Sequence, residues 1–117
     1  GHDSVMDPWY PLGFGDPLQA AFVLAHLGHM SGDDELRTLL DMITSGPAAA
    51  LGVEDYGIRE GGPADLVVFD ATSEAEALRL QRPRLLVLRA GRIIAETEPA
   101  RSTVVWNGVP EDVDFTP

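Results

Sequence analysis

An apolar helix near the start of the chain most constrains what this sequence can fold into. Asp16-Pro17 is a favourable helix opening, because aspartate caps free amide groups and proline suits the first helical position. The segment that follows, from Leu18 to about Met30, is apolar nearly all round, so we expect it to be covered on more than one side. No strand pattern precedes it. The sequence therefore predicts that the 117 residues lack part of the structure that covers this helix.

Two more helices are predicted before residue 53. Asp33 or Asp34 begins the second helix, and the acidic run Asp33-Asp34-Glu35 suits the dipole of a solvated helix start. Ser45-Gly46-Pro47 predicts the cap of a short third helix over 48–51, ended by Gly52. Four apolar residues of the second helix have the spacing of one helix face: Leu36, Leu39, Leu40 and Ile43.

From Val53 onward the hydrophobic period changes towards two, which is typical of strands. Leu66-Val67-Val68-Phe69 has the length and composition of a strand buried on both faces. Ser73 with Glu76 predicts a capping box for a short helix that ends near Gln81. The remaining expected elements are a hairpin of strands over 85–88 and 93–97 with Gly91 in the left-handed position, a strand over 103–106, and a tail over 107–117.

Charge and composition exclude several classes of function. The formal charge is −11 and every Lys or Arg position is arginine, so we expect neither nucleic-acid binding nor attraction to anionic membranes. The absence of cysteine excludes disulfide scaffolds, thiol nucleophiles and iron–sulfur sites, and is compatible with a cytoplasmic protein. The longest apolar stretch, Leu18 to Leu27, is too short to span the ~30 Å of bilayer hydrocarbon.

Two motifs have an ordinary structural interpretation that we favour over a functional one. Gly13-Phe14-Gly15 precedes a helix, as phosphate-binding loops do, but the third glycine of the dinucleotide fingerprint is absent, so we expect a simple loop. His26 and His29 are three positions apart on one helix, and a metal pair remains the alternative to packing or surface histidines.

The densest set of functional residue types lies at the start of the chain. Gly1-His2-Asp3-Ser4 is followed by Asp7-Pro8-Trp9-Tyr10-Pro11. An isolated aspartate is more often a cap or a surface group, because aspartate occupies turns freely. A carboxylate, a histidine and a tryptophan–tyrosine pair in a proline-stiffened loop can, however, hold and orient a flat polar ligand.

These residues carry a resemblance to a known family. Gly1-His2-Asp3 together with Asp7-Pro8-Trp9-Tyr10-Pro11-Leu12-Gly13 resembles the segment at the end of the eighth barrel strand in bacterial cytosine deaminases of the amidohydrolase superfamily. The similarity covers nearly the whole chain, and the stretch over 1–13 is more specific than that over 63–68. It continues through Leu18-Gln19, Leu51-Gly52, Glu54-Asp55-Tyr56-Gly57-Ile58, Gly62-Pro63-Ala64-Asp65-Leu66-Val67-Val68, Ala77-Leu78-Arg79 and Gly91-Arg92-Ile93-Ile94-Ala95.

The resemblance implies an α/β fold of which this chain is the C-terminal fragment. Members resemble a metal-dependent (β/α)8 barrel with a small β-sandwich domain. Residues 1–52 would form the end of strand eight and the following helices, and residues 53–117 the C-terminal strands of the sandwich. A barrel of this kind needs ~250 residues, so the chain cannot contain a whole one.

The resemblance also implies an activity and its residues. Asp3 matches the aspartate that binds the zinc or iron ion and moves protons while metal-bound hydroxide attacks the amine-bearing ring carbon of cytosine, giving uracil and ammonia. Trp9 matches a tryptophan that lines the pyrimidine pocket. Ser4 stands where well-known members carry a second aspartate, which leaves the preferred substrate open. The implied role is pyrimidine salvage.

Because the other metal ligands would lie outside these residues, we expect the isolated chain to be inactive and to hold no metal stably. The intact enzyme is expected to be a homo-oligomer acting on a small molecule. The alternatives are an amidohydrolase for another cyclic amine, such as isoguanine, creatinine or a hydroxytriazine, and a non-catalytic β-rich module.

Overall fold

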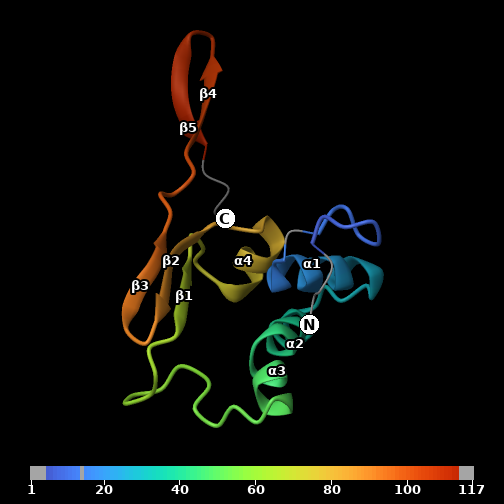
Figure 1. The fold of residues 1–117 in the computed structure, drawn as a ribbon. Coiled ribbons are helices and arrows are strands. Elements are labelled where there is room, and N and C mark those ends of the chain that lie inside the picture. The colour runs from blue at the N-terminus through green and yellow to red at the C-terminus, as the bar shows by residue number, and fades with distance from the viewer. Residues whose placement is uncertain (1–4, 14, 114–117) are drawn as a thin grey trace.

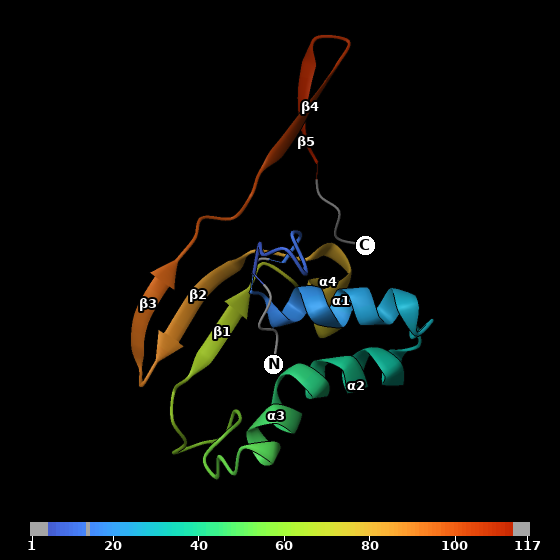
Figure 2. The ribbon, with the colours of Figure 1, turned by 45° about the vertical axis from the view of Figure 1, so that its right-hand side comes forward.

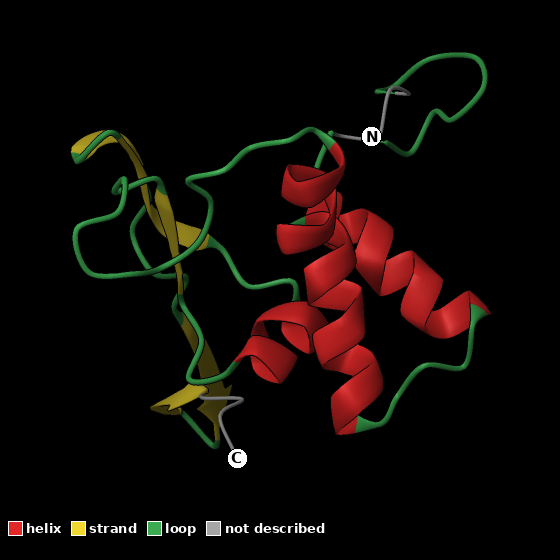
Figure 3. Cartoon of the chain, turned by 90° about the horizontal axis from the view of Figure 1, so that it is seen from below, coloured by secondary structure: helices red, strands yellow, loops and turns green. Residues whose placement is uncertain are grey.

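The computed structural model describes residues 5–13 and 15–113, which form a mixed α/β structure. The helices gather on one side and the strands on the other (Figure 3). The helices are α1 (Pro17–Leu27), α2 (Asp33–Ile43), α3 (Ser45–Ala50) and α4 (Glu74–Leu80). The strands are β1 (Leu66–Phe69), β2 (Arg84–Arg89), β3 (Arg92–Glu96), β4 (Ser102–Trp106) and β5 (Val109–Val113). No helix in this part of the chain is long and apolar enough to cross a membrane.

Helix α1 begins as the sequence predicts but ends earlier. The side chain of Asp16 accepts a hydrogen bond from the Leu18 N–H at 2.9 Å, and Pro17 occupies the first turn. The helix ends at Leu27 rather than near Met30, because the chain turns at His29, whose φ is 52°. The Met30 N–H then donates to the carbonyl of Ala25 at 2.9 Å, which closes the end of the helix.

The core lies where α1, α2 and α4 meet. Four residues make it up, Leu18, Ala21, Leu39 and Leu78, and each is at most 3% exposed. Of the predicted apolar face of α2, Leu39 is fully buried and its three companions pack against the core. The expected cover on several sides of α1 is absent among the described residues, because α2 and α4 cover one side while Leu27 on the far side is 76% exposed.

Strands β1, β2 and β3 form an antiparallel sheet in that order beside the helices (Figure 2). The predicted hairpin of β2 and β3 is confirmed. Ala90 and Gly91 in its loop both have positive φ, 48° and 73°, as a two-residue hairpin turn requires. The loop is tied to the residues just before β1, since the Ala90 N–H donates to Asp65 and the Gly91 N–H to the carbonyl of Ala64.

The expectation that β1 is buried on both faces is wrong for this chain. Val67 and Val68 point to opposite faces of the sheet, and they are 47% and 42% exposed. The sheet meets the helical core mainly at one end, where Phe69 packs against it. The apolar run of β1 is therefore half-exposed on both sides because no described element lies over either face along its length.

The predicted tail over 107–117 is also wrong, since residues 109–113 form β5, which pairs with β4 in a second hairpin. Its loop is Asn107-Gly108, with φ of 49° and 79°, and this dipeptide is the strongest short signal for a hairpin. The hairpin projects away from the rest of the molecule (Figure 1). Val104, Trp106 and Val109 share one of its faces and are 49%, 71% and 57% exposed.

An ion pair joins the helices to the sheet. The carboxylate oxygen of Asp16 that caps α1 also accepts a hydrogen bond from the guanidinium of Arg84 on β2. Asp16 is only 9% exposed, and the Arg84 guanidinium lies 5.2 Å from the centre of the Phe69 ring, within the range of a cation–π contact. Residues 68 positions apart in the sequence are thereby connected at the N-terminus of α1.

We expect Asp16→Ala to lower the free energy of unfolding of the chain by about 1 to 2 kcal/mol, because α1 loses its cap and Arg84 its partner. Asp16→Asn keeps the capping oxygen but removes the charge, so its effect should be smaller. Urea denaturation followed by helix ellipticity measures both. Asp34→Ala is the matched control, since that side chain is fully exposed, and equal losses in Asp34→Ala and Asp16→Ala would contradict this account.

Candidate functional site

The loop before α1 holds the site residues that the sequence predicts, as far as the structure describes them. Asp3 and Ser4 lie outside the described residues. Trp9 is 90% exposed, so the described residues place no wall over its indole. The structure therefore brings Trp9 to the surface beside α1 without enclosing a pocket around it.

The loop is folded by hydrogen bonds rather than by packing. One carboxylate oxygen of Asp7 accepts the main-chain N–H groups of Trp9 and Tyr10, each at 2.9 Å. The Met6 N–H donates to the carbonyl of Gly13 at 2.9 Å, so the two ends of the loop are joined. The side-chain amide of Gln19 on α1 donates to the carbonyl of Leu12 at 3.2 Å. The loop is thus closed on itself and tied to the first turns of α1.

Gly13 uses its polar groups within this loop. Its N–H donates to the carbonyl of Tyr10 at 3.3 Å, and its carbonyl accepts from Met6. The Gly13 amide is therefore engaged in a turn, as the loop interpretation of Gly13-Phe14-Gly15 predicts, and Phe14 lies outside the described residues.

His26 has a structural partner of its own. Its Nδ1 lies 2.8 Å from the carbonyl oxygen of Phe22, and the two rings are tilted at 55° with centres 4.4 Å apart. His29 follows the end of α1 at positive φ. Among residues 5–13 and 15–113, no cluster of three or more His, Asp or Glu side chains could hold a metal ion.

The metal that the resemblance implies is therefore not held by the described residues alone. Asp3 is the one ligand that the sequence predicts, and structural metal sites take four ligands and catalytic sites at least three from the protein.

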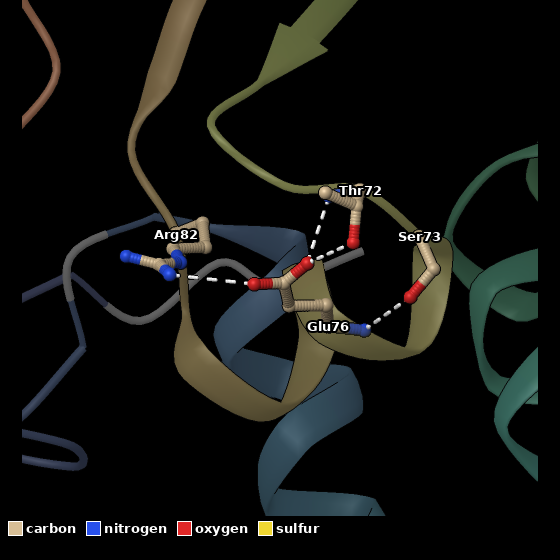
Figure 4. Close-up of polar contacts among 4 residues, drawn as sticks. All are labelled: Thr72, Ser73, Glu76 and Arg82. Atoms are coloured by element: carbon tan, nitrogen blue, oxygen red, sulfur yellow. Dashed lines mark hydrogen bonds and ion pairs between the residues drawn. The ribbon is translucent and has the colours of Figure 1, made fainter. Parts of the chain in front are cut away.

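A buried carboxylate in α4 is the polar centre that sequence reasoning described only in part (Figure 4). Ser73 Oγ accepts the Glu76 N–H at 3.1 Å, as the predicted capping box requires. The Glu76 side chain accepts its hydrogen bonds from Thr72, however, and not from the main-chain N–H of Ser73 as a capping box would have it. Its Oε2 accepts the N–H and the hydroxyl of Thr72 at 2.8 and 2.6 Å, and its Oε1 lies 3.3 Å from Nη2 of Arg82. The sequence gives no sign that Arg82 pairs with Glu76, because Arg82 lies beyond the end of α4 and outside the capping-box pattern.

These contacts hold Glu76 ionised. The hydrogen bonds from the Thr72 hydroxyl and main-chain N–H lower the pKa of Glu76 below its ordinary value of 4.5, and Arg82 adds to this effect against the opposing effect of burial. A carboxylate kept in its charged form is poorly suited to donate a proton near neutral pH. Glu76 therefore has a structural role: its carboxylate joins Thr72, two residues before α4, to Arg82, two residues before β2.

A groove of about 260 Å³ lies beside Glu76, between α4 and the β4–β5 hairpin. Two arginines, Arg82 and Arg101, and the carboxylates of Asp70, Glu76 and Asp112 line it. Charges of both signs border the groove, so it favours no ligand charge, and it contains none of the predicted site residues.

Comparison with known proteins assigns the family. The model of the Amidohydrolase family matches residues 1–107, and the chain belongs to that family. The chain is 39% identical over 97 residues to the N-isopropylammelide isopropyl amidohydrolase of Pseudomonas sp. strain ADP, covering 82% of this chain and 24% of the relative. It is 37% identical over 98 residues to the pterin deaminase of Rhizobium rhizogenes strain K84, covering 83% of this chain and 22% of the relative.

A solved structure is similar in both sequence and fold. The 5-methylcytosine deaminase of Klebsiella pneumoniae, in a crystal structure liganded with 5-fluorocytosine, superposes with a TM-score of 0.76 at 42% identity. The match covers 84% of this chain and 24% of the deaminase. The chain thus spans about a quarter of the length of the relatives it matches. Membership of the amidohydrolase family, which the resemblance implied, is confirmed.

The Glu76 network predicts a pH-dependent contribution to stability. Because the pKa of Glu76 is lower in the folded chain than in the unfolded chain, this contribution is complete above about pH 4.5 and is lost as the pH falls through the lowered value. Glu76→Gln should therefore be less stable than wild type near pH 7, and the difference should shrink as the pH falls below about 4.5. Urea midpoints across this range measure it.

The matched control is Glu74→Gln, an exposed carboxylate in the first turn of the same helix. Glu74→Gln should leave the urea midpoint nearly unchanged throughout this pH range. A gap between wild type and Glu76→Gln that stays constant down to low pH would contradict the assignment.

Proposed function

We propose that this chain is the C-terminal part of a metal-dependent hydrolase that removes the exocyclic amine of a nitrogen heterocycle, with cytosine as the first candidate substrate. The products would be uracil and ammonia. The observation that carries the proposal is the 42% identity, over 84% of this chain, to a 5-methylcytosine deaminase crystallised with 5-fluorocytosine. The family match over residues 1–107 supports it.

The division of the chain supports its proposed place in such an enzyme. Among the described residues, the helices before residue 53 pack together and the first strand begins at Leu66. We propose that residues 1–52 close a (β/α)8 barrel and that residues 53–117 complete a small β-sandwich domain. The exposed side of α1, including Leu27, fits a helix that covers barrel strands, because such helices are buried on their inner side. We place the intact enzyme in the cytoplasm as a homo-oligomer.

The proposed roles follow the matched positions. Asp3 is one ligand of the zinc or iron ion and carries the proton during hydrolysis, while Trp9 and Ser4 contact the substrate ring. A metal bound there supplies an activated water, and the remaining ligands come from outside this chain. The exposed indole of Trp9 supports its role, since a flat aromatic face suits stacking on a heterocycle.

A different ring amine is the second candidate substrate. The relatives with 39% and 37% identity are named for N-isopropylammelide and pterin, so a hydroxytriazine or a bicyclic amine competes with cytosine. Isoguanine and creatinine, which the resemblance leaves open, are further candidates for the substrate. A non-catalytic module is not favoured, because the family match extends over the segment that contains Asp3.

We expect the complete protein, assayed with zinc or iron, to release ammonia from cytosine faster than from isoguanine, creatinine, pterin or ammelide. Asp3→Asn should lower kcat/KM at least about 10²-fold, because the proton carrier is lost. Residues 1–117 alone should be inactive and should retain little metal, which elemental analysis measures. Ser4→Ala is the comparison variant. It should change the KM values of the different substrates relative to one another and leave kcat nearly unchanged.

Two results would overturn the proposal. One is a complete, metal-loaded protein that releases ammonia from none of these amines. The other is an Asp3→Asn variant with the wild-type rate on the best substrate. If the protein prefers ammelide or pterin to cytosine, the proposed reaction stands and the proposed substrate is wrong.

A further inference from the structure

Trp9 lies in the loop before α1, where packing does not hold it. The side chain is 90% exposed, and Met6 and Leu12 of the same loop are 81% and 73% exposed. An aromatic side chain contributes to binding when its orientation is set before the ligand arrives, because ordering it afterwards lowers affinity. Something other than burial must therefore fix the position of Trp9.

Asp7 is the residue that fixes the main chain at Trp9. Its Oδ1 accepts the N–H of Trp9 and the N–H of Tyr10 at 2.9 Å each, and Pro8, between Asp7 and Trp9, has no N–H to offer. This is the local turn that aspartate and asparagine form with the main chain two and three residues on. Two hydrogen bonds to one oxygen, with a proline fixing the intervening φ, leave the main chain at Trp9 little freedom.

The base of the turn is anchored to the outer side of α1. Tyr10 is half-buried and lines a shallow groove of about 240 Å³ on α1, together with Val23, Leu24 and Leu27. Gln19 donates from α1 to the carbonyl of Leu12 at 3.2 Å. Asp7 therefore connects an anchored residue, Tyr10, to an exposed one, Trp9, through a single carboxylate oxygen.

We propose that Asp7 is a positioning residue: its carboxylate oxygen sets the main chain of Trp9 so that the indole presents its face to the substrate ring. The inference rests on the proposed function, in which Trp9 contacts that ring. Asp7 acts through Trp9, and what it supplies for this role is an acceptor oxygen for the main chain.

The test compares Asp7→Asn and Asp7→Ala in the complete enzyme. Asparagine offers the same acceptor oxygen, so Asp7→Asn should keep KM and kcat for the best ring amine near wild type. Asp7→Ala removes the acceptor and should raise KM about tenfold while changing kcat much less. Equal losses in Asp7→Asn and Asp7→Ala would overturn the proposal, because they would show that the charge itself is needed. Wild-type kinetics in Asp7→Ala would overturn it as well.

A double-mutant cycle separates positioning from a general weakening of the loop. If Asp7 acts through Trp9, Asp7→Ala should add almost nothing to the KM of Trp9→Ala. Full additivity of the two changes would overturn the proposal, since Asp7 would then act on substrate by a route that does not involve the indole.

A spectroscopic measurement keeps this inference distinct from the proposed function. In protein labelled with 5-fluorotryptophan, the ¹⁹F resonance of Trp9 is assigned by its loss in Trp9→Phe. It should shift or broaden in Asp7→Ala and stay in place in Asp7→Asn, and an unmoved resonance in Asp7→Ala contradicts the role of Asp7. If the complete enzyme deaminates no ring amine, the proposed function fails, while this resonance still decides whether Asp7 sets the conformation of Trp9.

Discussion

The contact between Asp16 and Arg84 holds the two halves of this chain together. A single buried carboxylate caps α1 and binds the guanidinium of β2, and Phe69 lies beneath that guanidinium. Few other contacts join the sheet to the helices among the described residues. A capping residue usually stabilises only its own helix. Here it also fixes where the sheet starts relative to α1, so a local backbone requirement becomes a constraint on the tertiary structure.

The surfaces that stay open fit a chain that is about a quarter the length of its relatives. One side of α1, both faces of β1 and one face of the β4–β5 hairpin expose apolar side chains. A two-stranded hairpin is marginal in water unless an apolar face is packed. The exposed residues mark faces that no other part of the described chain covers.

Local signals predicted most of the elements, because caps and turns depend on a few adjacent residues. Asp16-Pro17, Ser73 and Ala90-Gly91 all act as the sequence indicated. The errors have a different origin. Asn107-Gly108 is a local turn signal that lies at the start of the predicted tail and shows that a strand can follow it. The exposure of Val67 and Val68 depends on what lies over the sheet, which no local pattern encodes. For the site, the pattern of residue types predicted Trp9 as a candidate but not the role of Asp7, because hydrogen bonds from a side chain to the main chain follow from the conformation of the turn.

A series of polar contacts connects the loop that carries Trp9 to residues far from it. Arg84 holds Asp16, Asp16 caps α1, and Gln19 in the first turn of α1 holds the carbonyl of Leu12. Asp7 then holds Trp9. Each contact is a hydrogen bond with a defined direction, whereas apolar packing constrains orientation less, so the series fixes direction as well as distance. An exposed aromatic residue can therefore be placed accurately on a surface loop, provided that the helix beneath it is itself fixed to the sheet.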